Sequence, residues 1–137
     1  MNFYNKNILI IGLGISGVSA ARLCNKLGAR VTINDLKDKE FLLESIEQLK
    51  GLNINYLLGC TPDSIIDKQD IIIISPGVPI NLPYLLDAKK LGIPVIGEIE
   101  LGYLFCDCPI IAITGTNGKT TTATLVGEML KNAHYDT

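Results

Sequence analysis

The amino-acid sequence predicts an α/β fold: an open parallel sheet of about five strands with helices on both faces, followed by an incomplete β–α unit. Three observations support this prediction. Short apolar runs alternate with segments whose apolar residues recur at helical spacing. A glycine-rich loop, G-L-G-I-S-G, follows the first apolar run. A second one, G-T-N-G-K-T, follows the last.

Composition limits the class of protein before any motif is considered. The chain has 137 residues, of which 47% are hydrophobic and 19% charged, so it has enough apolar residues for a folded core. The net charge of −2, without a Lys/Arg cluster, argues against a nucleic-acid-binding face. No apolar run approaches the ~20 residues of a membrane span, and the first run stops at Gly12, too early for a cleavable signal. We therefore expect a cytoplasmic protein with no membrane partner and with four free cysteine thiols.

The chain begins with the order strand, glycine-rich loop, helix, strand and acidic residue. The first strand is expected at 7–11, the helix at 18–27 and the second strand at 30–34, with Asp35 directly after it. This is the order of a Rossmann-like nucleotide-binding domain.

Three glycines of the first loop have separate roles in such a domain. Gly12 makes the tight turn, Gly14 permits close approach of a diphosphate, and Gly17 lets the helix pack on the strand. The G-x-G-x-x-G spacing alone is a weak signal, and the strand before it and Asp35 after it make it more specific.

The next segments continue the alternation of helix and strand up to a linker at 106–109. The run D-I-I-I-I-S is apolar on both faces, as a central parallel strand is, and leads into S-P-G-V-P at the edge where ligands bind. The expected elements are a helix at 38–50, a strand at 55–58, a short helix or turn at 64–68, a strand at 70–75, a helix at 83–91, a strand at 93–96 and a short helix at 97–105.

The second glycine-rich loop follows an expected buried strand at 110–113 and opens a helix. The N–H groups of a helix's first turn favour an anion, and Gly115 and Gly118 let the backbone approach it. Lys119 adds a positive charge near the outer phosphates, and the Thr120 hydroxyl can ligate Mg²⁺. These features predict a phosphate-binding P-loop.

This loop is a shorter variant of G-x-x-x-x-G-K-[ST], because Ile113 stands where the first glycine is expected. The alternative interpretation is a helix at 120–132 that merely begins after a glycine-containing turn.

The strand, loop and helix cannot bury their own apolar faces, so the chain is expected to stop inside a second domain. We expect 110–137 to be loosely held, paired with another copy or docked on the first domain.

Four motifs in this order and spacing resemble the Mur ligase family, and in detail its D-glutamate-adding branch. They are G-L-G-I-S-G, S-P-G-V-P, G-I-P-V-I-G-E-I-E-L and I-T-G-T-N-G-K-T-T-T, and they span essentially the whole chain. The resemblance implies a Rossmann-like UDP-substrate-binding domain at 1–108 and the truncated start of a central ATP-binding domain at 109–137.

The same resemblance implies the reaction and the site residues. The full-length enzyme would use ATP and Mg²⁺ to add D-glutamate to UDP-N-acetylmuramoyl-L-alanine through an acyl phosphate, whereas this part alone would bind UDP without catalysis. Leu36 stands where the family often has a hydroxyl residue. Implied substrate contacts are Gly14, Ile15, Ser16, Gly17, Asp35, Leu36 and Gly77. Implied ATP contacts are Gly115, Thr116, Asn117, Gly118, Lys119, Thr120 and Thr121, with Lys119 in a catalytic role and Thr120 on the metal.

Two other interpretations remain open. An NAD-binding Rossmann module, either an oxidoreductase or a redox-sensing regulator, is favoured by Asp35, because an acid there suits a ribose diol. The second phosphate loop counts against it. The other is a small non-catalytic UDP-binding or scaffold protein that is complete as it stands.

Overall fold

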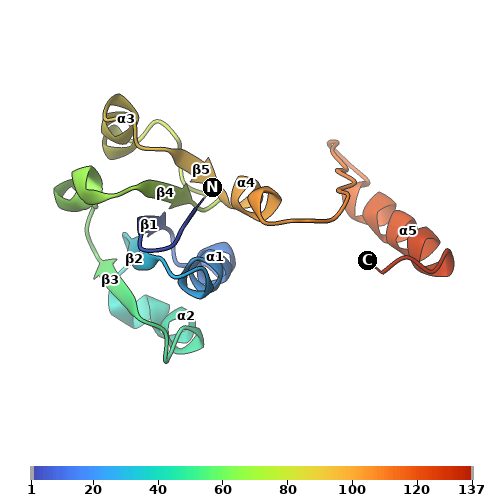
Figure 1. Cartoon of the computed structure of the whole chain (residues 1–137), viewed down its shortest axis with the longest axis horizontal. Coiled ribbons are helices and arrows are strands. Elements are labelled where there is room, and N and C mark those ends of the chain that lie inside the picture. The colour runs from blue at the N-terminus through green and yellow to red at the C-terminus, as the bar shows by residue number, and fades with distance from the viewer. Residues whose placement is uncertain (1, 137) are drawn as a thin grey trace. The chain divides into compact units, whose positions relative to one another are not determined.

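The computed structural model describes residues 2–136 and contains one five-stranded sheet (Figure 1). All neighbouring strands are parallel, in the order β3-β2-β1-β4-β5. This confirms the predicted α/β class and its number of strands. The strands are β1 (Asn7–Ile11), β2 (Arg30–Asp35), β3 (Ile54–Leu58), β4 (Ile71–Ile74) and β5 (Val95–Gly97).

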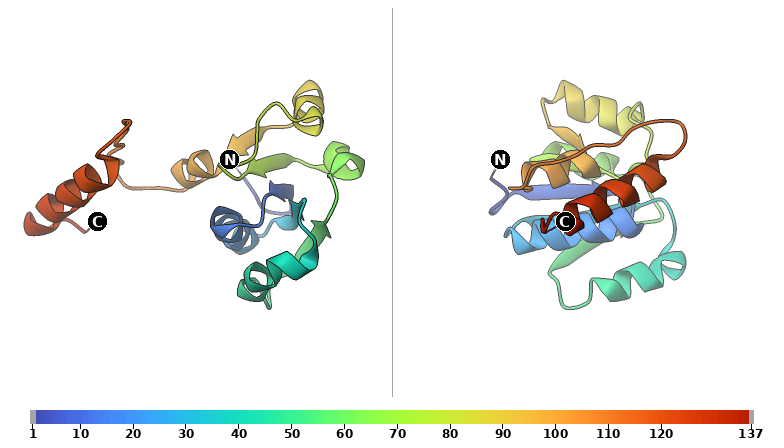
Figure 2. Two further views of the ribbon diagram at one scale, coloured as in Figure 1. Left: turned by 180° about the vertical axis from the view of Figure 1, so that it is seen from behind. Right: turned by 90° about the vertical axis from the view of Figure 1, so that its right-hand side faces the viewer.

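Helices cover both faces of the sheet, also as predicted (Figures 1 and 2). Successive residues of a strand point to opposite faces, so Ile8 and Ile10 enter one core while Leu9 and Ile11 enter the other. The first core lies under α1 (Ile15–Lys26), α2 (Leu43–Gln48) and α4 (Glu98–Leu104). The second lies under α3 (Pro83–Lys90) and the 3₁₀ turn Asp63–Lys68.

Three elements differ from the sequence prediction by more than one residue at an end. The expected helix at 38–50 is a 3₁₀ turn, Lys39–Leu42, followed by α2, because Leu42 leaves helical geometry (φ −121°) and is buried. The last strand starts at Val95 because Pro94 has no N–H to donate and the N–H of Ile93 closes α3. Helix α1 starts earlier than expected, at Ile15, so its first turn is made from the glycine-rich loop itself.

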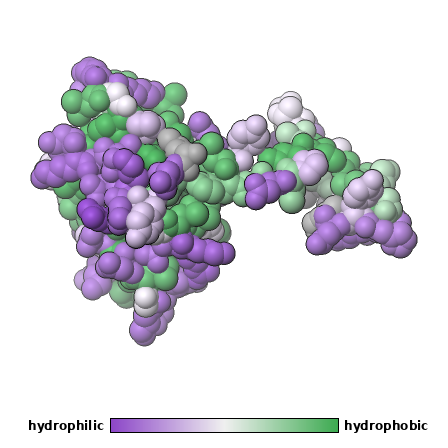
Figure 3. All heavy atoms as spheres, viewed as in Figure 1, coloured by the Kyte–Doolittle hydropathy of each residue, from purple (hydrophilic) through white to green (hydrophobic). Residues whose placement is uncertain are grey.

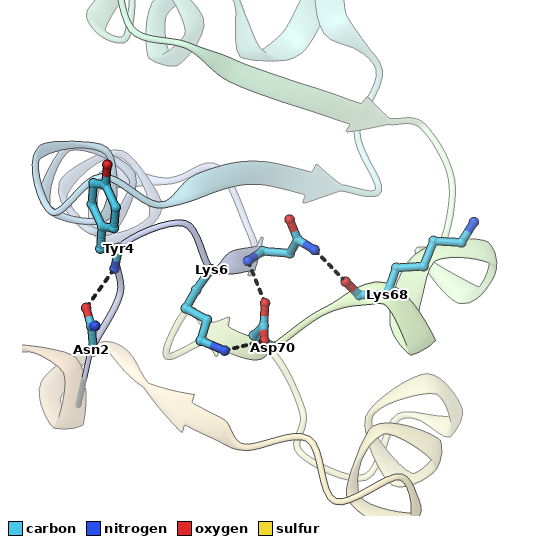
Figure 4. A network of polar contacts seen from close by, with 6 residues as sticks. Asn2, Tyr4, Lys6, Lys68 and Asp70 are labelled. Atoms are coloured by element: carbon cyan, nitrogen blue, oxygen red, sulfur yellow. Dashed lines mark hydrogen bonds and ion pairs between the residues drawn. The ribbon is translucent and has the colours of Figure 1, made fainter.

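A polar network joins the starts of β1 and β4 at the amino edge of the sheet (Figure 4). Lys6 Nζ lies 2.8 Å from Asp70 Oδ1, and the Asn7 N–H donates to Asp70 Oδ2 at 2.8 Å. The Asn7 side chain donates to the carbonyl of Lys68 at 3.1 Å. The hydrogen bond from Lys6 and, after it, the one from the Asn7 N–H lower the pKa of Asp70. The network lies at the edge of the sheet opposite to the loops that follow β1 and β4.

The chain divides into two compact units, the first ending at Phe105 and the second starting at Cys106. The second contains α5 (Lys119–Asn132). Within the part that the structure describes, this unit has no strand, so the predicted buried strand at 110–113 is wrong. A strand needs a neighbour for its N–H and C=O groups, and this unit supplies none. Ile110 and Ile111 are 53% and 60% exposed, and hydrophobic side chains lie at the unit's surface (Figure 3).

No helix among the described residues is both long and apolar enough to cross a membrane.

Candidate functional site

The loops after β1 and β4 meet where the strand order reverses, and ligands of open α/β sheets bind at that point. The Gly12 N–H donates to the carbonyl of Asn34 at 2.8 Å, which fixes the loop after β1 to the end of β2. On the other side, the Ser75 hydroxyl donates to the carbonyl of Gly12 at 3.2 Å, and the Ser75 N–H donates to the carbonyl of Ile11 at 3.0 Å. The glycine-rich loop is therefore held from both neighbouring strands.

Two of the loop's glycines are required by its own packing. Gly12 has a φ of +97°, and a Cβ there would lie 2.8 Å from the hydroxyl oxygen of Ser75. A Cβ on Gly17 would overlap the carbonyl oxygen of Gly12. The first turn of α1 can lie against the loop only because both side chains are absent, as the sequence analysis expected.

Gly14 has a different environment, because no heavy atom lies within 4 Å of a Cβ placed there. Gly14 directly precedes α1, and no side chain caps the start of this helix. The first hydrogen bond of the helix runs from the Val18 N–H to the Gly14 carbonyl at 3.0 Å. The amides of Ile15, Ser16 and Gly17 thus belong to the unpaired first turn of a 12-residue helix. Together with the helix dipole, they form a cradle suited to an anion such as a diphosphate.

Asp35 is bound to the backbone on both sides of the site. Its Oδ2 accepts from the N–H of Leu13 at 2.8 Å, and its Oδ1 accepts from the N–H of Lys37 at 2.9 Å. The carboxylate therefore joins the glycine-rich loop to the turn that carries Leu36. In a dinucleotide site the equivalent acid would bind ribose hydroxyls.

A cleft of about 250 Å³ lies between the end of β2 and the loop after β4. It brings together three residues expected to contact substrate, Asp35, Leu36 and Gly77, whereas Gly14, Ile15, Ser16 and Gly17 do not line it. Ile15 is 91% exposed and Leu36 64% exposed, so both side chains are open to a ligand. The other residues that line the cleft are Ile11, Gly12, Asn34, Lys37, Val78, Pro79, Leu82 and Tyr84.

Two polar residues of this cleft, Asn34 and Tyr84, were not expected from the sequence. Asn34 is fully buried, whereas the other polar residues of β2 are partly or fully exposed. Neither residue carried a signal, because Asn34 stands in a strand that alternates polar and apolar residues and Tyr84 reads as one more apolar position of α3. Burial, and secondarily the carboxylate of Asp63, raises the pKa of Tyr84, so its hydroxyl stays neutral.

The loop before α5 is the second candidate site. Gly118 precedes the helix with a φ of +76°, and a Cβ there would meet open space. The Lys119 ammonium bends back over the loop and donates to the carbonyl of Gly115 at 2.6 Å. Thr116, Asn117, Thr120 and Thr121 are exposed. Unpaired helix amides, an ammonium and a hydroxyl fit a phosphate chain.

The loop before α5 offers fewer residues for binding a metal ion than for binding phosphate. Among residues 2–136, no three His, Cys, Asp or Glu side chains form a cluster that could hold an ion. The exposed Thr120 could supply a hydroxyl ligand beside phosphate oxygens, and Mg²⁺ sites of this kind use few protein ligands.

Fold and site together define a nucleotide-binding domain of the doubly wound α/β class. A family model described as "Mur ligase MurD-like, N-terminal domain" matches residues 6–97, and the chain belongs to this family. This confirms the resemblance found in the sequence.

Individual relatives agree with the family model. The UDP-N-acetylmuramoylalanine--D-glutamate ligase of Alkaliphilus oremlandii (strain OhILAs) is 44% identical over 135 residues, which are 97% of this chain and 30% of the relative. The chain thus spans about 30% of the length of the curated relatives it matches.

Solved structures show the same fold. A pseudomurein peptide ligase type C from Methanothermus fervidus is 32% identical, with a TM-score of 0.53 over 93% of this chain and 26% of that one. An L-alanine dehydrogenase has a TM-score of 0.51 over 69% of this chain and 28% of its own. At 24% identity, this second likeness concerns the fold alone.

Proposed function

We propose that this chain is the UDP-binding part, with the beginning of the ATP-binding part, of a ligase that adds D-glutamate to UDP-N-acetylmuramoyl-L-alanine. Two things support the proposal: the family of the chain and the names of its 44% identical relatives. The observation that carries the UDP site is the cleft beside the uncapped, Gly14-led start of α1. Such an enzyme acts on precursors of the cell wall, and we expect it in the cytoplasm, where ATP and UDP-linked precursors are present.

In this proposal each part of the site binds one part of the substrate. The amides of Ile15, Ser16 and Gly17 bind the diphosphate, and Gly14 leaves room for it. The cleft binds the uridine, with Leu36 and Gly77 along its walls and Asp35 holding the surrounding backbone. The exposed Ile15 side chain covers one face of the base. The UDP-binding domain comprises 1–108, and 109–137 start the ATP-binding domain.

The second loop serves the energy-coupling step of the whole enzyme. Gly115 to Thr121 surround the ATP phosphates, and Lys119 exchanges its contact with the Gly115 carbonyl for the charge of the transferring phosphoryl group. Thr120 supplies one ligand to Mg²⁺, which neutralises phosphate charge when bound.

The proposed reaction forms one amide bond at the expense of one ATP. A carboxylate oxygen of the substrate attacks the γ-phosphorus, ADP leaves, and an acyl phosphate forms. The amine of D-glutamate then attacks the acyl carbon, and inorganic phosphate leaves. Because the chain spans about 30% of its relatives, we expect this part to bind UDP without catalysing the reaction.

Thermal unfolding with UDP, with UDP-N-acetylmuramoyl-L-alanine and with NAD⁺ tests the proposal. A ligand that binds only the folded chain raises the free energy of unfolding by ~2.7 kcal/mol at a hundred times its Kd. We expect both uridine nucleotides to raise the melting temperature and NAD⁺ to leave it unchanged. A rise with NAD⁺ and none with UDP would replace the ligase assignment by a nicotinamide-binding module.

A further inference from the structure

The strand β3 is the last strand at one end of the sheet, and within residues 2–136 no strand pairs with its outer edge (Figure 1). The N–H of Gly59, directly after β3, donates to the carbonyl of Asp35 on β2 at 3.0 Å. Backbone groups of alternate residues point to the same edge of a strand, so the odd-numbered residues 53–59 face β2. The N–H and C=O groups of Ile54, Tyr56 and Leu58 therefore face outwards, away from the sheet.

The outer edge of β3 lacks the features that usually keep a sheet edge from pairing, which are charged side chains, proline or a very short strand. The opposite edge strand, β5, has two of them, because it is three residues long and follows Pro94. In contrast, the run 52–60, L-N-I-N-Y-L-L-G-C, contains no charged residue and no proline. Asn55 and Tyr56 in this run are exposed. The edge of β3 is therefore suited to pairing with a further strand.

The sequence of β3 is suited to pairing with a second copy of itself. In an antiparallel pair centred on Tyr56, this residue lies opposite its own copy, and Ile54 lies opposite Leu58 of the second copy. The outward-facing backbone groups of the two strands then meet, so each of these residue pairs can exchange both of its N–H···O=C hydrogen bonds. A charged side chain at the centre would face its own like charge. Burial raises the pKa of Tyr56, so the hydroxyl at the centre is neutral at pH 7.

A surface hollow of about 410 Å³ lies beside this edge and is lined by Lys39, Ile46, Tyr56 and Leu58. Ile54 and Leu58 pack on the first core but are only partly buried, so part of their apolar surface is still accessible. Side chains that lie opposite each other in an antiparallel pair share one face of the sheet. Ile54 of a second copy would therefore lie next to Leu58 at the hollow, and both apolar side chains would lose contact with water.

We propose that two copies of this chain associate through β3, whose outer edges pair antiparallel about Tyr56 to form one continuous sheet. A two-fold axis passes between the two strands, so the same residues meet from both sides. A second copy suits this edge because the backbone groups, the apolar face and the absence of charge all match when β3 meets itself. The association involves no residue of the nucleotide cleft and is independent of the proposed UDP function.

Sedimentation velocity of the whole chain over a series of concentrations tests this association. We expect a monomer–dimer equilibrium in which the average mass rises with concentration. In Tyr56→Lys two like charges face each other at the centre of the strand pair, so the Kd of the dimer should rise about fivefold or more. Asn55→Lys is the matched control, because it adds the same charge one residue away, where the charge lies opposite Leu57 of the second copy. It should change the Kd much less.

Two results would overturn the proposal. One is a chain that stays monomeric at every concentration. The other is a dimer that is as stable in Tyr56→Lys as in the unaltered chain. Ile111→Lys distinguishes the source of such a dimer, because Ile111 is exposed in the second unit and is not part of β3. Weakening by Ile111→Lys and not by Tyr56→Lys would assign the association to the second unit and contradict the role of β3.

Hydrogen exchange of the unaltered chain covers the case in which Tyr56→Lys does not fold. The amides of Ile54, Tyr56 and Leu58 face outwards, so their exchange should slow as the concentration rises and the dimer forms. The amides of Asn55 and Leu57 face β2 and should change little. Exchange at the three outward amides that stays the same while the average mass rises would rule out pairing through β3.

Discussion

At the residue scale, the Asp35 carboxylate holds together two backbone segments of the candidate site. Its two oxygens accept from the N–H groups of Leu13 and Lys37, at 2.8 and 2.9 Å. These N–H groups belong to the glycine-rich loop and to the turn that carries Leu36. The acid thus sets the distance between the two halves of the proposed UDP site. The acid at the end of β2 therefore has a structural role that does not depend on a contact with a ribose diol.

Asp70 gives a prediction about pH and stability. Its folded-state pKa is lowered by Lys6 and by the N–H of Asn7, so its charged form stabilises the fold above its unfolded pKa. That contribution disappears as the pH falls through the lower, folded pKa. We expect Asp70→Asn to lose about 1 kcal/mol of unfolding free energy at pH 7, because the pair is partly exposed and screened by solvent.

Urea unfolding at a series of pH values measures this contribution. The difference between the unaltered chain and Asp70→Asn should shrink to zero at strongly acidic pH. Asp87→Asn is the matched control, because the Asp87–Lys90 pair lies at the surface of a single helix and should contribute little. A difference between Asp70→Asn and the unaltered chain that grows towards acidic pH would rule out this role for the carboxylate.

At the element scale, the start of α1 depends on two glycines for different reasons. A Cβ on Gly17 overlaps the carbonyl of Gly12, so Gly17→Ala must push the helix away from β1. We expect it to destabilise the fold by about 1–3 kcal/mol, the usual cost of overpacking.

Gly14→Ala is the matched comparison for Gly17→Ala. Its Cβ meets no atom within 4 Å, so the loss of stability should stay below about 1 kcal/mol, while UDP binding weakens because the new methyl occupies the anion cradle. Chemical denaturation and UDP titration of both variants measure the two effects separately. Equal losses of stability in the two variants would contradict the proposed division of roles.

The second unit gives a prediction about local order. The segment 110–113 forms no strand, and Ile110 and Ile111 are exposed, whereas Ile71–Ile74 is buried and paired in β4. Hydrogen exchange should therefore be much faster at 110–113 than at Ile71–Ile74. Equal protection of the two segments in a monomer whose second unit is not docked would contradict this, and slow exchange in a dimer would show pairing with another copy.

At the scale of the whole molecule, the sequence predicted the first unit better than the second. Runs such as Ile71–Ile74 form strands because both faces are covered, and a glycine or proline limits most of the elements. The same reasoning applied to Ile110 and Ile111 failed, because an apolar run becomes a strand only where a neighbouring strand pairs with it.

The sequence predicted those parts of the candidate site that belong to one local motif, and it did not predict the parts that only the fold brings together. Gly12 and Gly17 have roles that depend on residues nearby in the sequence or on the adjacent strand, and motif spacing captures them. Asn34 and Tyr84 reach the cleft through the sheet order and the packing of α3, neither of which is visible in the sequence. The contact of the Asp35 carboxylate with the Leu13 amide likewise required the folded backbone.

The central claim is that the first unit binds a uridine diphosphate across the start of α1 and the adjoining cleft. Backbone amide chemical shifts of the ¹⁵N-labelled chain, titrated with UDP and separately with NAD⁺, test it most directly. We predict the largest UDP-induced changes at 14–17, 35–37 and 77–78, and no changes with NAD⁺ at the same concentration. Changes at these positions with NAD⁺ but not with UDP, or UDP-induced changes confined to other residues, would contradict it.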